Sequence, residues 1–172
     1  DALMQKIQAA RGLATETFVL VQSLQTQSLE TFNQDLLKAG YRLAALCPYP
    51  QGDQLLCMAA WKRDGRQSVF TLQSSAAQLQ QLQAKYEQAG YFADDVVAYS
   101  TDHHKTVVFA CVWTTTPPLP VVLESRMYVD LAEEDHQALG WEPLLSRGFV
   151  PRSNVLTSDQ NERAAYTSIR SP

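Results

Sequence analysis

The chain carries little charge of either sign and does not concentrate it. Its 14 Lys and Arg residues and 18 Asp and Glu residues give a formal net charge of −4 at pH 7 over 172 residues. The basic residues are scattered and form no stripe. Because affinity for nucleic acid depends on clustered Lys and Arg that neutralise phosphates, this pattern argues against a nucleic-acid partner.

Long hydrophobic runs are also missing. Every uninterrupted apolar stretch is far shorter than the roughly 20 residues that a membrane-spanning helix needs, so the sequence predicts no membrane span. The chain begins at Asp1, and no charged and then apolar leader follows. We therefore expect a segment of a larger multidomain protein, whose other domains would be its partners. The sequence indicates no compartment.

Cysteine is scarce, and three residues do not make the disulfide framework of a small secreted protein. Cys47 and Cys57 flank a predicted hairpin turn, and Cys111 lies in another apolar run. A cross-strand disulfide between Cys47 and Cys57 is one interpretation. Buried free thiols are the other, since Cys is among the most often buried residue types.

Sequence motifs for catalysis and metal binding are absent. The chain contains no Gly-x-Ser-x-Gly, no glycine-rich phosphate loop, no Cys-x-x-Cys and no His-x-x-x-His. His103 and His104 stand beside Asp102 in a turn, but adjacent histidines do not easily chelate one ion. The sequence therefore predicts no catalytic residue, no metal and no cofactor, and it favours a protein that is not an enzyme.

Two acidic features invite a functional interpretation. Asp94 and Asp95 could form a carboxylate pair, but neighbours in a strand point to opposite faces, so we expect exposure at a strand start. The densest polar cluster runs from Asp130 to His136. Cation binding is one interpretation of that cluster, and a capped helix start with a solvated face is the other.

An internal repeat organises the chain. The segment from Gly40-Tyr41 to Trp61 recurs as Gly90-Tyr91 to Trp113, and more weakly as Gly148-Phe149 to Ile169. The glycines are 50 and then 58 residues apart. From the aromatic residue after each glycine to the end of the segment there are 20, 22 and 20 residues.

The helices before the first two glycines share the same apolar spacing. Residues of matching type stand 11, 8, 4 and 1 positions before each glycine: Leu29, Phe32, Leu36 and Ala39 before Gly40, and Leu79, Leu82, Tyr86 and Ala89 before Gly90. This spacing places them on one helix face. We predict Ser28 as the N-cap of the first helix and Ser74 or Ser75 as that of the second.

Each unit reads as strand, helix, strand, strand. After an N-terminal helix over 1–14, the predicted strands are 18–21, 43–49, 55–61, 69–72, 96–99, 107–113, 121–129, 150–156 and 163–169, with Pro48, Pro50 and Gly52-Asp53 in the first hairpin turn and a third helix opening at 130–135. We expect an N-terminal helical extension at 1–16 and repeats at 17–66, 67–118 and 119–172, which together form one continuous domain. The predicted fold class is α+β: three β-α-β-β repeats in a curved, mostly antiparallel, half-barrel-like sheet with helices on one face.

The first unit resembles the bacterial tandem repeat domain family. The resemblance rests on Leu36-Leu37-Lys38-Ala39-Gly40-Tyr41-Arg42, then Tyr49, Gly52-Asp53 and Ala59-Ala60-Trp61. Similar repeats form the amino-terminal part of polyglycine hydrolases, and the resemblance implies a half-barrel of sheet with helices outside. The catalytic serine part of those enzymes is a separate domain that has no counterpart here. The chain departs from the family pattern at Leu43, where the family has Pro, and at Val150 and Ile169, which replace Arg42 and Trp61 in the third unit.

The recurring aromatic residues are the candidate ligand-binding residues: Tyr49, Trp61, Tyr99 and Trp113. An aromatic groove for a peptide or glycan is one interpretation, and core packing is the other. The leading functional hypothesis is a non-catalytic repeat module that binds a ligand or acts as a scaffold. The alternatives are a hydrolase domain with its site on the concave sheet face and a structural assembly module that pairs through its sheet edges.

Overall fold

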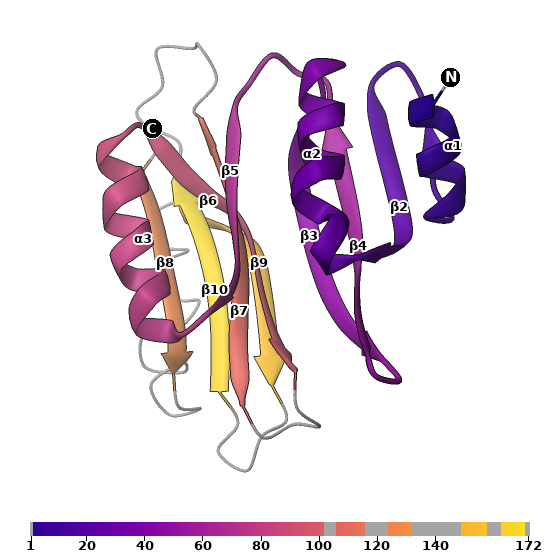
Figure 1. Cartoon of the computed structure of the whole chain (residues 1–172). Helices are drawn as coiled ribbons and strands as arrows, with labels where there is room; N and C mark the ends of the chain where they lie inside the picture. Colours follow the sequence, from indigo (N-terminus) through magenta and orange to yellow (C-terminus); the bar gives the residue numbers. More distant parts are fainter. Residues whose placement is uncertain (1, 102–105, 116–123, 132–148, 158–162, 171–172) are drawn as a thin grey trace.

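The computed structural model describes residues 2–101, 106–115, 124–131, 149–157 and 163–170 (Figure 1). The elements of the first part are α1 (Ala2–Ala9), β1 (Leu13–Ala14), β2 (Phe18–Gln25), a 3₁₀ turn (Thr26–Ser28), α2 (Leu29–Lys38), β3 (Arg42–Gln51) and β4 (Gln54–Lys62). The second part has β5 (Ser68–Ser74), α3 (Ala76–Gln88), β6 (Tyr91–Ser100) and β7 (Val107–Thr115). Three further strands are β8 (Glu124–Leu131), β9 (Phe149–Thr157) and β10 (Arg163–Arg170).

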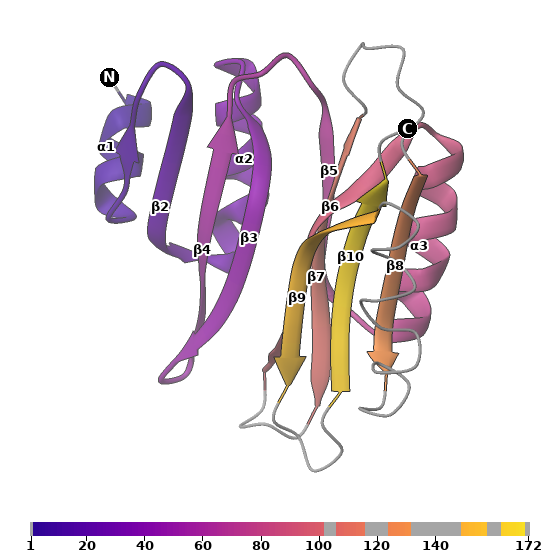
Figure 2. The ribbon, with the colours of Figure 1, turned by 180° about the vertical axis from the view of Figure 1, so that it is seen from behind.

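The three sheets repeat one strand order. The orders are β1-β2-β4-β3, β5-β7-β6 and β8-β10-β9, and every pairing is antiparallel. In each unit the last two strands form a hairpin and the first strand pairs with the last. All nine predicted strands are present, most of them longer than predicted. The described helices lie on one side of the first two sheets, whereas β8–β10 lie behind β5–β7 in Figure 1 and in front of them in Figure 2. The α+β class is therefore confirmed.

Bulges also recur at the repeat spacing. The register of β2 on β4 shifts between Val21 and Leu24, and that of β5 on β7 shifts between Thr71 and Ser74, 50 residues later. A second pair of bulges interrupts β3 and β6 just after their first residues. A bulge bends a strand and turns its side chains to new directions. The duplicated units thus share their irregularities as well as their elements.

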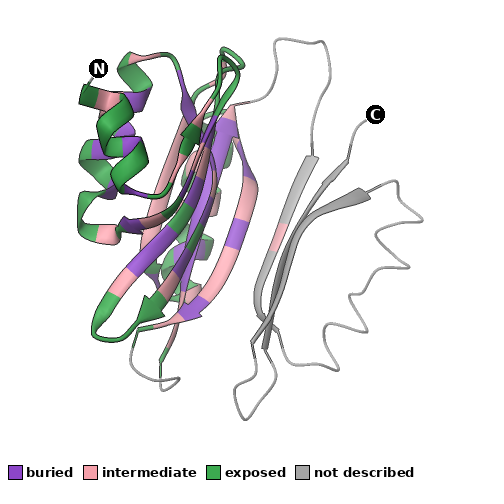
Figure 3. Ribbon diagram, turned by 90° about the vertical axis from the view of Figure 1, so that its right-hand side faces the viewer, coloured by how far each residue is buried: buried purple, intermediate pink, exposed green. Residues whose placement is uncertain are grey.

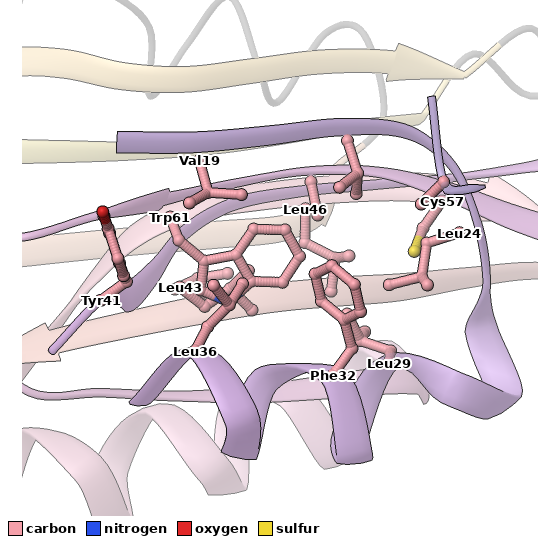
Figure 4. Close-up of a cluster of buried hydrophobic side chains, with 14 of the residues drawn as sticks. Val19, Leu24, Leu29, Phe32, Leu36, Tyr41, Leu43, Leu46, Cys57 and Trp61 are labelled. Atoms are coloured by element: carbon pink, nitrogen blue, oxygen red, sulfur yellow. The ribbon is translucent and has the colours of Figure 1, made fainter. Parts of the chain in front are cut away.

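The core of the first unit lies between α2 and its sheet. Leu29, Phe32 and Leu36 are at most 4% exposed, and they point from α2 toward Trp61 (Figure 4). In the second unit Leu79 is fully buried, and Leu82 and Tyr86 pack against the same cluster. The predicted helix faces are therefore the packed faces. Figure 3 shows buried, intermediate and exposed residues alternating along the strands, with the more exposed helices on their left.

The N-terminal helix is shorter than predicted. It ends at Ala9, and Leu13–Ala14 is a strand that pairs with β2 instead of a last helical turn. Arg11 takes a positive φ of 52°, and a Cβ on Gly12 would lie 2.5 Å from the carbonyl oxygen of Leu20. The chain reverses here because only glycine permits this close approach to β2.

The first hairpin turn is tighter than predicted. Pro48 and Pro50 belong to β3, opposite Cys57 and Leu55, and only Gly52-Asp53 form the turn. Proline is tolerated because β3 is an edge strand, where the missing N–H need not be paired within the sheet. One face of β4 is only partly covered, since Met58 on that face is 44% exposed.

The three cysteines are free thiols, so the disulfide interpretation is wrong. In the antiparallel register Cys47 lies opposite Met58, and Cys57 lies opposite Pro48. Cys47 is exposed, whereas Cys57 is buried in the core. Burial raises the pKa of the Cys57 thiol to about 12, with a smaller contribution from Cys47. Cys57 therefore stays a neutral, packed side chain.

The two serine caps predict different effects on stability. Ser75 forms a capping box with Gln78, whereas Ser28 follows a 3₁₀ turn, lies in the helical region and makes no side-chain cap bond. We expect Ser75→Ala to lower the free energy of unfolding by about 1 kcal/mol and Ser28→Ala to leave it nearly unchanged. Urea denaturation followed by circular dichroism measures both. Equal losses in the two variants would contradict the assigned caps.

Candidate functional site

The two repeat tryptophans lie in the core. Both are 0% exposed, and each packs between its helix and its sheet. The Trp61 Nε1–H donates to Asn33 Oδ1 at 2.9 Å, and the Trp113 Nε1–H donates to Gln83 Oε1 at 2.8 Å. Their rings lie beside aromatic neighbours, with centroid distances of 5.4 Å from Trp61 to Phe32 and 4.8 Å from Trp113 to Tyr86.

The amide partners of the tryptophans were not recognised from the sequence. Asn33 and Gln83 stand 50 residues apart, each seven positions before its repeat glycine. The sequence signal for this contact was an amide side chain at the same position of an otherwise apolar helix face in both repeats. A buried indole N–H needs an acceptor, and both repeats supply an amide oxygen at the same place.

The repeat tyrosines hold the bulges of the first strand in each unit. The Tyr49 hydroxyl donates to the carbonyl oxygen of Gln22 at 2.7 Å. The Tyr99 hydroxyl accepts from the Gln73 amide at 3.0 Å, and burial raises the pKa of this phenol. Together with the tryptophans, these residues take part in packing and backbone bonding within each unit. The structure does not bring the four predicted ligand-binding residues together around one open groove within its described part.

The most developed polar site joins the two repeats. It consists of Arg42, Asp64, Arg66, Asp94 and Thr114, here called the Arg42 network. Arg42 begins β3 and is only 2% exposed. Its Nε and Nη2 donate to the two Asp64 carboxylate oxygens at 2.8 and 2.6 Å. Such bidentate pairing is the strong geometry for Arg and carboxylate.

The same guanidinium reaches into the second repeat. Arg42 Nη1 donates to Thr114 Oγ1 of β7 at 3.1 Å and lies 3.8 Å from Asp94 Oδ2 of β6. Thr114, itself fully buried, donates its hydroxyl to the same Asp94 oxygen at 3.3 Å. One buried charge on β3 therefore connects the first repeat to β6 and β7 of the second.

The neighbours of Asp64 stabilise its ionised carboxylate. Hydrogen bonds from Arg42 hold the pKa of Asp64 well below its usual range, against the opposing effect of burial, and Arg66 contributes further. Arg66 approaches the same carboxylate at 2.7 Å, and it is more exposed than Arg42. Asp64 is thus ionised across the physiological pH range.

The expectation that Asp94 and Asp95 are exposed is wrong. The Asp94 side chain is 16% exposed and belongs to the Arg42 network, whereas Asp95 Oδ2 accepts from the Leu46 amide of β3 at 3.0 Å. The β6 bulge between Ala93 and Asp95 breaks the alternation of faces on which the expectation rested. Both carboxylates therefore bind the first repeat. The first repeat has Ala44 and Ala45 at the equivalent positions, a difference that could have signalled this role.

A groove opens between β5 and α3. It has a volume of about 490 Å³ and is lined by Thr71, Leu72, Gln73, Ser74, Gln78, Gln81, Leu82 and Lys85. The helix residues stand at positions i, i+3, i+4 and i+7, so they form one face of α3. We call this the repeat-2 groove. Its lining is mostly polar and carries a single charge, that of Lys85.

Other candidate sites from the sequence can be placed only in part. Asp102, His103 and His104 lie outside the described residues, as do Glu133, Glu134, Asp135 and His136. Asp130 belongs to β8, so the prediction that a helix opens at this residue is wrong. Within the described ranges, no three His, Cys, Asp or Glu side chains are grouped to hold a metal ion. None of the helices in the described part is both long and apolar enough to cross a membrane.

Comparison with known proteins identifies the repeats. A family model described as a polyglycine hydrolase-like structural repeat matches residues 24–64 and again residues 65–116, together more than half of the chain. The two matches meet between β4 and β5, at the junction that the Arg42 network spans. No curated protein matches the sequence.

Proposed function

Because the chain belongs to the family of polyglycine hydrolase-like structural repeats, we propose that it is a non-catalytic scaffold module whose repeats are coupled into one rigid unit. The observation that carries this proposal is the buried Arg42 guanidinium, which binds Asp64 in its own repeat and Thr114 and Asp94 in the next. A rigid spacer needs strong contacts between its repeats, because neighbouring repeats that share only a weak interface can unfold separately.

Apolar contacts across the same junction support the coupling. Tyr99, Ala110 and Val112 of the second repeat are buried in one cluster with Leu43 and Leu46 of β3. The Asp95 carboxylate also covers the backbone amide of Leu46 at the β3 edge. One backbone amide of this edge strand is thereby bonded to the second repeat. We further propose that the third unit continues the array into a curved, half-barrel-like sheet, which its shared strand order supports.

Amide hydrogen exchange measured by mass spectrometry tests the coupling. Leu36→Ala destabilises the core of the first repeat. It should lower the protection of backbone amides from exchange in β6 and β7 as well as in β3 and β4, because a coupled array opens as a unit. The same change in an Arg42→Met background should lower protection in the first repeat more than in the second. Unchanged protection of β6 and β7 in Leu36→Ala alone would contradict the scaffold proposal.

A further inference from the structure

The N-terminal segment shows what occupies the groove of the first repeat. The end of α1 covers the β2 bulge, where the carbonyl oxygen of Ala10 accepts from the amides of Gln22 and Ser23 at 3.2 and 3.1 Å. Lys6 Nζ of α1 lies 2.6 Å from Asp35 Oδ2 on α2. Ile7 and Ala10 are 1% and 5% exposed. A helix end thus fits between the first strand and the helix of a repeat.

The repeat-2 groove is the equivalent place in the second repeat. Leu72 and Gln73, 50 residues after Gln22 and Ser23, form its strand side. Lys85, 50 residues after Asp35, stands on its helix side. In the first repeat these two sides are bridged by α1 and its salt bridge. In the second they line an open groove, and the Gln73 amide donates to the Tyr99 hydroxyl at 3.0 Å.

The charge at this place is reversed between the repeats. Asp35 of the first repeat receives a lysine, whereas Lys85 of the second is exposed and forms no ion pair within the described part of the chain. The strand side is also more polar, since Thr71 and Ser74 replace Val21 and Leu24. A second copy of α1 would place Lys6 against Lys85, so like charges oppose self-docking.

We propose that the repeat-2 groove binds the end of an amphipathic helix from a partner protein, which lies between strand and helix as α1 does in the first repeat and carries a carboxylate opposite Lys85. The seating follows from the occupied groove of the first repeat, and the carboxylate follows from charge complementarity with Lys85. The groove does not depend on the Arg42 network, so this binding and the coupling of the repeats are separable.

Two peptides test the proposal by fluorescence anisotropy. One has the sequence of residues 1–14 with Lys6→Glu, and the other has the natural residues 1–14; both carry the same dye. The intact protein should bind the Lys6→Glu peptide about fivefold more tightly, since a charge pair at a partly exposed site is worth about 1 kcal/mol. Its own α1 already occupies the first groove, and Asp35 repels the glutamate peptide there.

Reversing the charge of Lys85 is the decisive experiment. The Lys85→Glu variant should reverse the preference and bind the natural peptide more tightly. Lys62→Glu, which makes the same charge change at an exposed residue on β4, should keep the original preference. The proposal is overturned if the protein binds neither peptide, if Lys85→Glu leaves the preference unchanged, or if Lys62→Glu reverses it as well. Tighter binding of the natural peptide by the unmodified protein would overturn it in favour of self-docking.

Discussion

Arg42→Met is expected to lower the free energy of unfolding by about 2–4 kcal/mol, because it removes the buried cation from Asp94 and leaves Asp64 with Arg66 alone. The lower end of this range allows for the 29% exposure of the Asp64 side chain, which lets water replace part of the lost interaction. Arg66→Met removes the other guanidinium from the same carboxylate and is the matched control. Arg66 is more exposed, so its loss should cost under about 1 kcal/mol.

Guanidinium denaturation at pH 7 measures both variants. A double-mutant cycle with Asp94→Asn should give a positive coupling energy with Arg42, because the two side chains share one buried network. Equal losses in the Arg42 and Arg66 variants would show that burial of the guanidinium does not matter. A coupling energy of zero would mean that Arg42 acts within the first repeat alone.

The contact between Arg42 and Asp64 also makes the free energy of unfolding depend on pH in the acid range. The folded-state pKa of Asp64 lies below its unfolded value of about 3.9, so its stabilising contribution is present above that pH and is lost as the pH falls further. The difference in stability between the protein and Arg42→Met should therefore shrink from pH 5 toward pH 2. A difference that stayed constant over this interval would contradict the assignment of the lowered pKa to Arg42.

Trp61→Ala is expected to lower the free energy of unfolding by about 3–5 kcal/mol, the range for truncating a large buried aromatic side chain. Trp61 is fully buried against Phe32, and its indole N–H is bonded to Asn33, which is 5% exposed. Trp61→Phe keeps much of the packing but leaves the Asn33 oxygen unpaired, so it should still cost about 1–3 kcal/mol. Far-UV circular dichroism follows unfolding without depending on tryptophan fluorescence.

Met58→Ala is the control for Trp61, because Met58 lies on the same strand and is 44% exposed. It should cost well under 1 kcal/mol on the scale of surface substitutions, roughly ±0.5 kcal/mol. If Trp61→Ala cost no more than Met58→Ala, the tryptophan would not be a core residue. The interpretation of the repeat aromatics as ligand-binding residues would then be favoured over core packing.

The spacing of apolar residues was enough to predict the elements. Leu29, Phe32 and Leu36 recur at helical intervals, and strands rich in Leu, Ala and Val flank them. These features reflect local propensities and burial, which leave a period in the sequence. Duplication added a second, independent sign, since the same types recur at the same offsets before Gly40 and Gly90. The strand order followed in part, because short hairpins pair their own strands.

The junction between the repeats depended on tertiary structure. Asp94 and Asp95 were expected to point to opposite faces and into solvent, but a bulge in β6 turns both toward the first repeat. A bulge arises from the pairing of two strands, so the period of one strand does not reveal it. For the same reason the sequence did not show that Arg42 is buried, since its partner Thr114 lies 72 residues away.

What the sequence determined by itself is therefore the repeating β-α-β-β unit, the apolar face of each helix and the recurrence of Trp61 as Trp113. These depend on neighbours along the chain. The tertiary structure decided which groups meet. The indoles bind their amides, and Arg42 binds the following repeat. The end of α1 packs on the first repeat, at the place where the second repeat has an open groove. Such contacts depend on how separate elements pack, and local sequence patterns do not encode that geometry.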